Sequence, residues 1–167
     1  SAPLSHVLPA RIVCSSRAAL EAHAALGYDR RRMVQIDNGV DTAIFAPDDD
    51  VRAAARAALG IGDGEFVVAL PARFEPVKGH ALLFAAAARL LPTTPGLRLL
   101  LFGSGAANVD VGAGAVQRRT IALGARRDVP ALLNAADVVV SCSGYSESFS
   151  NAVVEALACG VPVVATD

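Results

Sequence analysis

Two positive side chains stand close together in a segment rich in turn-forming residues. Arg73 and Lys78 lie between an apolar run that ends at Leu70 and a helical stretch that begins at Gly79. A cation near the start of a helix opposes the helix dipole, whereas an anion is stabilised there by free backbone N–H groups. The spacing therefore fits a phosphate site. It fits equally well two solvated surface charges, one of them paired with Glu75.

Two carboxylates, Glu147 and Glu155, mark a second segment that could do chemistry. Glu155 is the only charge in an apolar helical stretch from 150 to 159, and it shares a helix face with Asn151 at i, i+4. A largely buried carboxylate needs hydrogen-bond partners, because without them it is destabilising or its pKa rises. Sugar hydroxyls would be suitable partners. The alternative is that Glu155 faces solvent and that Glu147 is an ordinary acid at the start of a helix.

Two glycines follow the apolar run 97–102. Gly103 and Gly105 would let the backbone approach a ligand closely. However, the sixth position of a dinucleotide fingerprint is Asn108 here, so a tight turn near some ligand fits better than a nicotinamide site. A further segment, 124–128, is interpreted as an ordinary basic loop in which Asp128 caps the next helix.

The elements that must position these residues alternate along the chain. We expect strands at 11–14, 33–37, 66–70, 97–102, 119–123, 137–141 and 161–165, and helices at 15–26, 51–59, 79–91, 129–135 and 150–159. Continuous apolar strands are typical of parallel sheets covered on both faces. The sequence thus predicts an α/β fold with a doubly wound, Rossmann-like parallel sheet. The four candidate loops would gather at the carboxyl ends of the strands, where ligands bind in such sheets.

Composition excludes several classes of protein. Hydrophobic residues make up 53% of the 167 residues, which indicates a globular chain. A net charge of -1 argues against binding to nucleic acid or to an anionic membrane. The longest apolar stretch, 81–91, contains Arg89 and is too short to span a bilayer. Three scattered cysteines indicate reduced thiols in a cytoplasmic protein, and three histidines without ligand spacing argue against a metal site.

Taken in order, these motifs resemble the retaining glycosyltransferases of family 4, the large group 1 family with the GT-B fold. The sequence departs from the family pattern at Ala72, Ser148 and Ser150, where glycines are usual, and at 106–117, where a helix is usual. Each motif alone is a weak indication of this family, but the complete set in this order is specific for it. It comprises Asn38-Gly-Val-Asp41 with Phe45 and Pro47, Arg73 with Lys78-Gly79, Phe102-Gly-Ser-Gly105, Gly124 with Arg126, Asp128 and Val129, and Glu147 with Glu155 followed by 158–165.

The resemblance implies a role for each matching residue. Arg73 and Lys78 would hold the donor diphosphate and stabilise the leaving nucleotide, and Glu147 would lie against the donor sugar. Glu155 would contact the ribose hydroxyls, and Arg126 would lie beside the base. Gly103 and Gly105 would form the next donor loop. The backbone N–H groups of Phe149, Ser150 and Asn151 would contact sugar hydroxyls or phosphate. No metal or other cofactor is implied.

The resemblance also implies a domain organisation. Residues 1–37 would be the tail of an N-terminal acceptor domain, 38–50 an interdomain linker, and 51–167 a nucleotide-sugar-binding domain truncated at its C-terminus, the C-terminal half of a GT-B enzyme. We expect a hexosyltransferase-type enzyme that uses a UDP- or GDP-sugar with retention and an unknown acceptor. The fragment alone would bind donor weakly without transferring sugar, and it could dimerise through residues 1–40. The alternatives are a non-catalytic nucleotide-binding module and, with less support, a nicotinamide-dependent oxidoreductase domain.

Overall fold

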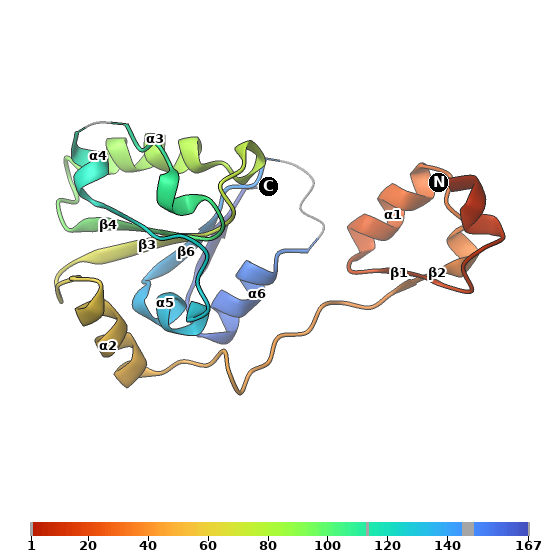
Figure 1. Cartoon of the computed structure of the whole chain (residues 1–167), viewed down its shortest axis with the longest axis horizontal. Helices are drawn as coiled ribbons and strands as arrows, with labels where there is room; N and C mark the ends of the chain where they lie inside the picture. The colour runs from red at the N-terminus through yellow and green to blue at the C-terminus, as the bar shows by residue number, and fades with distance from the viewer. Residues whose placement is uncertain (1, 113, 145–148, 167) are drawn as a thin grey trace. The chain divides into compact units, whose positions relative to one another are not determined.

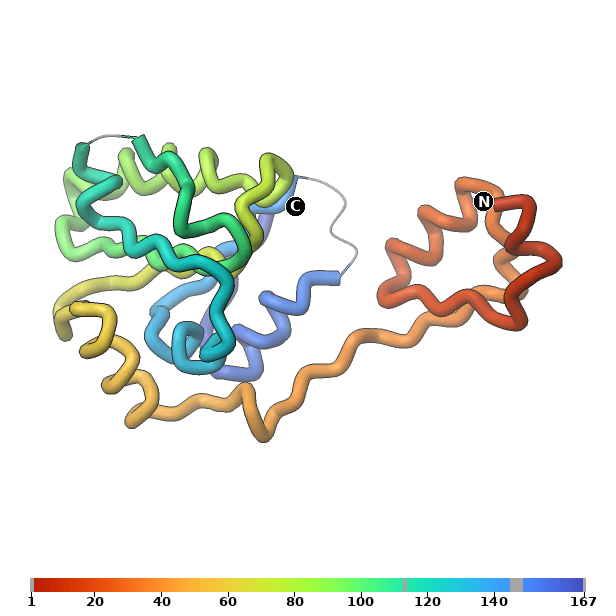
Figure 2. Tube along the Cα trace, viewed as in Figure 1, coloured from red at the N-terminus to blue at the C-terminus, as the bar shows by residue number. Residues whose placement is uncertain are grey.

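The chain folds as two compact units, Ser1–Gly39 with Ser146–Asn151 and Val40–Tyr145 with Ala152–Asp167 (Figure 1). The structure is a computed structural model that describes residues 2–112, 114–144 and 149–166. Residues 36–48, which connect the last strand of the first unit to the first helix of the second, form no helix or strand (Figure 2). None of the described helices combines the length and the apolar character that crossing a bilayer requires.

The smaller unit contains a parallel pair of short strands joined by a helix. Strand β1 (Ile12–Cys14) pairs with β2 (Met33–Gln35), and α1 (Arg17–Ala25) lies between them in sequence, flanked by the 3₁₀ turns η1 (Ala2–His6) and η2 (Arg30–Arg32). The Ser16 hydroxyl caps α1 by accepting a hydrogen bond of 3.1 Å from the Ala19 N–H. The strands and the helix expected in this region are therefore present with slightly shorter bounds.

The larger unit is built on a parallel sheet of five strands in the order β5-β4-β3-β6-β7. The strands are β3 (Phe66–Pro71), β4 (Leu97–Phe102), β5 (Thr120–Ala122), β6 (Val138–Ser141) and β7 (Val163–Ala165). The order runs outward from β3 in one direction and from β6 in the other, so the point of reversal lies between these two strands. The doubly wound parallel sheet predicted from the sequence is thus confirmed, and a ligand is expected at the carboxyl ends of β3 and β6.

Both faces of this sheet are covered. On β3, Val67 and Ala69 point into one core, whereas Val68 and Leu70 point into the other. Figure 1 shows α2 (Asp49–Ala58), α5 (Val129–Ala135) and α6 (Asn151–Ala158) on one face and α3 (His80–Leu90) and α4 (Ala115–Arg118) on the other. Burial on both faces explains why the strands are continuous apolar runs in the sequence.

Three local expectations need correction. The helix expected at 51–59 begins at Asp49, because the Asp48 carboxylate accepts a hydrogen bond of 2.9 Å from the Val51 N–H and caps it. Asp128 stands before α5 but its side chain makes no capping bond, since it is engaged by Arg126 instead. The stretch 106–117, expected to lack a helix, contains the 3₁₀ turn η4 (Ala106–Asn108) and the start of the short α4.

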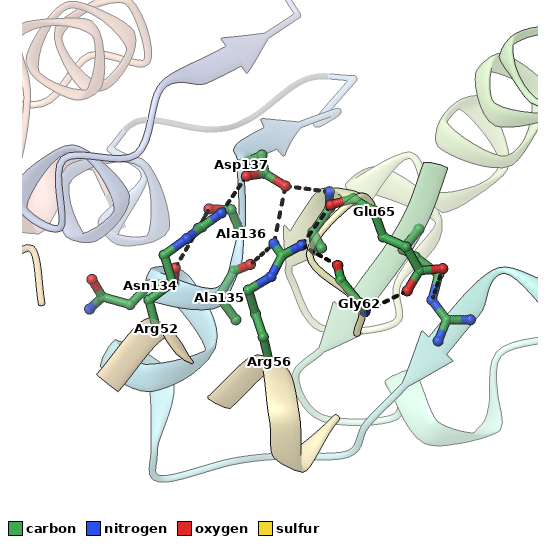
Figure 3. A network of polar contacts seen from close by, with 10 residues as sticks. Arg52, Arg56, Gly62, Glu65, Asn134, Ala135, Ala136 and Asp137 are labelled. Carbon is green, nitrogen blue, oxygen red and sulfur yellow. Dashed lines mark hydrogen bonds and ion pairs between the residues drawn. The ribbon is translucent and has the colours of Figure 1, made fainter. Parts of the chain in front are cut away.

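A buried charge network fastens α2 to the amino ends of the strands (Figure 3). Arg56 is only 8% exposed and donates hydrogen bonds to the Glu65 carbonyl at 2.6 Å and to the Asp137 carboxylate at 3.3 Å. Asp137 also accepts from the Val67 N–H at 2.7 Å and from Arg52 at 2.5 Å. Burial would raise the pKa of Asp137, but these hydrogen bonds and the two arginine charges outweigh it and lower the pKa. The network lies at the opposite rim from the candidate loops.

Candidate functional site

A pocket of about 260 Å³ opens at the carboxyl ends of β3 and β4, entirely within the larger unit. Its wall is built from segments that are far apart in the sequence. Arg73 follows β3, Gly103 follows β4, Arg126 follows β5, and Glu155 lies on α6, which follows β6. Phe102 and Val129 add apolar surface. The parallel topology therefore brings four residues singled out from the sequence around one cavity.

The loop after β3 carries the two cations. Arg73 is exposed, and its guanidinium Nη1 lies 2.8 Å from Oε1 of Glu75. This is the ion pair that the sequence left open as an alternative. Lys78 is half-buried and ends the 3₁₀ turn η3 (Pro76–Lys78), and the left-handed Gly79 (φ 67°) separates it from α3. Lys78 thus precedes the helix rather than lying in its first turn, and it is not among the described residues that line the pocket.

The glycines after β4 allow two loops to pack directly on each other. A Cβ on Gly103 would come within 2.3 Å of the Ala72 carbonyl oxygen, and one on Gly105 within 3.2 Å of the Phe74 Cβ. The contact is reinforced by a hydrogen bond of 2.8 Å from the Phe74 N–H to the Ser104 carbonyl. Loop packing is thus one sufficient reason for glycine at both positions. Gly103 also lines the pocket, whereas Gly105 lies against Phe74.

Sequence reasoning gave no functional weight to His80, the first residue of α3. The residue is 4% exposed, and its ring packs edge-to-face on Phe74, with centroids 5.2 Å apart, and at a tilt against Phe84. Neither ring nitrogen has a hydrogen-bond partner, and burial lowers the pKa of His80. A neutral imidazole therefore supports the loop that carries Arg73. The proximity of this histidine to the turn was the only available signal in the sequence.

Glu155 is half-buried at the wall of the pocket. Within the described part of the chain its carboxylate has no hydrogen bond and no ion pair, and burial raises its pKa. Its charge also contributes to the raised pKa of the buried Cys159 one helical turn away, where burial is the larger cause. A carboxylate held in this way is a good acceptor for ligand hydroxyls, because such contacts replace the water that it has lost.

Arg126 is held by its neighbour rather than left free for a ligand. Its Nε and Nη2 donate to the two carboxylate oxygens of Asp128 at 2.7 and 2.5 Å. This pairing lowers the pKa of Asp128. The guanidinium is thus bound to Asp128 at the surface. A ligand in the pocket would therefore meet mainly the backbone of this loop and the apolar stem of the Arg126 side chain.

The remaining predicted site residues lie around the start of α6. Phe149 and Ser150 are half-buried and precede the helix, and Asn151 is its exposed first residue. All three belong by their contacts to the smaller unit. Glu147 lies outside the described residues. Among the residues that the structure does describe, no three histidine, cysteine or acidic side chains gather as metal ligands.

Comparison with known proteins gives consistent matches. Residues 51–167 match the family model described as glycosyl transferases group 1. The chain is 41% identical over 150 residues to a D-inositol 3-phosphate glycosyltransferase of Segniliparus rotundus and 40% identical over 153 residues to one of Mycobacterium bovis, matches that cover 82% and 83% of the chain. It is also similar to the crystal structure of Anabaena HepE in complex with UDP-glucose, with a TM-score of 0.87, 29% identity and 98% of the chain covered.

These matches cover only part of each relative. The chain spans 32% and 30% of the length of the two curated relatives and 46% of the HepE chain.

Proposed function

Because the chain belongs to the group 1 glycosyl transferases, we propose that it supplies the donor-binding part of an enzyme that transfers a sugar from a nucleotide sugar. Its parallel sheet is that of the C-terminal half of a GT-B glycosyltransferase, as expected from the sequence. One observation carries the proposal: Arg73, Arg126 and Glu155 line a single pocket at the carboxyl ends of the strands. That rim is where doubly wound sheets bind nucleotides.

The first donor to test is a UDP-sugar, with a GDP-sugar as the second. The complex of HepE with UDP-glucose supports this order, because that protein shares the fold at 29% identity. Residues 51–167 would form the nucleotide-sugar domain, 38–50 the interdomain linker and 1–37 the end of an acceptor domain. The curated relatives make an inositol phosphate the first acceptor to test with the complete protein.

The proposed roles follow from charge and position. Arg73 and Lys78 would neutralise the diphosphate as the bond between sugar and phosphate breaks, so that the nucleotide leaves as a stabilised anion. Glu155 would accept hydrogen bonds from the ribose hydroxyls, which its exposure to the pocket permits. The backbone of the Arg126 loop would lie along the base, and Gly103 would border the donor. Glu147 would contact the sugar, together with the N–H groups of Phe149, Ser150 and Asn151. Two cations at the diphosphate would take the place of a divalent ion, and the anomeric configuration would be retained.

Calorimetric titration of the chain with UDP, GDP and NAD tests the proposal. We expect UDP to bind, GDP to bind equally or more weakly, and NAD to give no heat above dilution, with EDTA leaving UDP binding unchanged. Glu155→Gln should weaken UDP binding about tenfold, since a hydrogen bond to a charged acceptor is worth roughly 1–1.5 kcal/mol more than one to a neutral acceptor. Asp63→Asn, an exposed acid at the opposite rim, is the matched control. Binding of NAD in place of UDP would contradict the assignment.

A further inference from the structure

The ion pair between Arg73 and Glu75 joins a residue of the pocket wall to an acid that the proposed function does not use. We propose that Glu75 is a built-in counter-ion, which holds Arg73 in the nucleotide-free protein and must be displaced by the donor diphosphate. Glu75 then weakens nucleotide binding and speeds the release of the nucleoside diphosphate product. The inference rests on the proposed function, since it takes the pocket to be the diphosphate site.

The first supporting observation is that the Glu75 carboxylate has no structural task of its own. Glu75 stands at the capping position of η3, yet its side chain makes no capping hydrogen bond. Only its backbone serves the turn, because the Lys78 N–H donates to the Glu75 carbonyl at 3.0 Å and the Glu75 N–H donates to the Arg73 carbonyl at 2.9 Å. Removing the charge of Glu75 therefore leaves the hydrogen bonds of the loop intact.

The second observation is that the backbone under Arg73 is fixed while its side chain is free to swing. The next residue, Phe74, donates to Ser104 at 2.8 Å and packs against the buried His80 ring. The Arg73 side chain, in contrast, is 65% exposed. Among the residues that the structure describes, Glu75 is its sole ion-pair partner. Arg73 can thus pass from Glu75 to a phosphate by a change of rotamer alone, which is fast for an exposed side chain.

The third observation concerns electrostatics. The Glu75 carboxylate lies 2.8 Å from the Arg73 guanidinium, so a phosphate has to compete with it for this cation, and the displaced carboxylate remains in the same loop as a like charge that opposes the bound dianion. An exposed ion pair is weak, and solvent screens the repulsion. The two effects together correspond to roughly a two- to tenfold change in nucleotide affinity. A change of this size would leave the site functional while shortening the lifetime of the bound product.

The test is a double-mutant cycle measured by calorimetry with UDP. The variants are Glu75→Gln, Arg73→Gln and the double substitution, and Asp63→Asn controls for the same change in net charge. We expect Glu75→Gln to tighten UDP binding about two- to tenfold and Asp63→Asn to leave it within about 1.5-fold. The gain should be at least about twofold smaller when Arg73 is already glutamine, and it should shrink in 0.5 M salt. Uridine, which lacks the diphosphate, should show no gain.

The possible results distinguish a failure of the inference about Glu75 from a failure of the proposed function. Unchanged or weaker UDP binding by Glu75→Gln overturns the inference while leaving the proposed function standing, and so does an equal gain in the Arg73→Gln background or with Asp63→Asn. Absence of UDP binding by the wild-type chain overturns the proposed function and the inference with it. Glu75→Ser is the second variant, and circular dichroism of each variant verifies that the fold is retained.

Discussion

Replacement of Arg56 by methionine tests how strongly the charge network at the amino ends of the strands holds the larger unit together. Methionine keeps much of the length and the apolar stem of arginine but none of its donors. The Arg56 guanidinium donates to the Ala135 carbonyl at 3.1 Å, to the Gly62 carbonyl at 3.0 Å, to the Glu65 carbonyl at 2.6 Å and to Asp137 at 3.3 Å. The substitution therefore removes the partner of groups in α5, in the turn before β3 and in the residue that precedes β6 (Figure 3).

The expected loss of unfolding free energy depends on which partners Asp137 keeps after the substitution. Removing one partner of a buried ion pair typically costs about 3–5 kcal/mol, because the other charge is left uncompensated. Here Asp137 keeps the Arg52 guanidinium and the Val67 N–H, and its side chain is 21% exposed. We therefore expect a loss at the lower end of that range, about 3 kcal/mol of unfolding free energy. For a unit of about 120 residues that corresponds to roughly 12 °C in Tm.

Urea unfolding followed by circular dichroism measures the loss, with the free energy extrapolated to water. Arg89→Met is the control, since Arg89 is an exposed α3 residue without an ion pair in the described part of the chain. It should change stability by less than about 0.5 kcal/mol. A loss below about 1 kcal/mol for Arg56→Met would refute the reasoning, because it would mean that water satisfies these carbonyls as well as the arginine does.

Gly103, His80 and Glu155, at the rim of the sheet opposite the charge network, give three further predictions. Gly103→Ala should lower stability and weaken UDP binding at least threefold, since its Cβ would lie 2.3 Å from the Ala72 oxygen; calorimetry that finds wild-type affinity would contradict this. Burial lowers the pKa of His80 below 6.5, so the unfolded chain binds the proton more readily and stability should fall as the pH drops below about 6.5. His80→Phe should flatten that part of a pH–Tm profile relative to wild type, and parallel profiles would exclude the assigned cause. Burial raises the pKa of Glu155 above 4.5, so its contribution to stability falls as the pH rises through that window. Glu155→Gln should therefore raise Tm at pH 7 while it weakens nucleotide binding, and a lower Tm would argue that the carboxylate is stabilising.

Much of the fold is encoded in patterns that are visible along the chain. The run 97–102 is strand β4 over the full predicted length, and 129–135 is helix α5 over the full predicted length. Strand β3 extends the predicted run by one residue. These elements could be predicted because burial on both faces leaves an unbroken apolar run, and because glycine and proline mark the turns. The order of the motifs also led to the family that the comparison shows.

Other features depended on which residues meet in space. The sequence left open whether Glu75 pairs with a cation. It placed Asp128 correctly at the N-cap position of α5 but did not show that its side chain binds Arg126 instead of capping the helix. It contained no sign that Arg56 would be buried against Asp137, 81 residues away.

The sequence alone therefore determined the alternation of strands and helices and the type of sheet, and it predicted a set of candidate site residues. The tertiary structure decided which of those residues share one pocket, because loops that leave separate parallel strands meet only once the sheet has formed. Hydrophobic periodicity reflects how each residue faces the core, whereas the pairing of Arg56 with Asp137 depends on a distance across the fold that no local pattern contains.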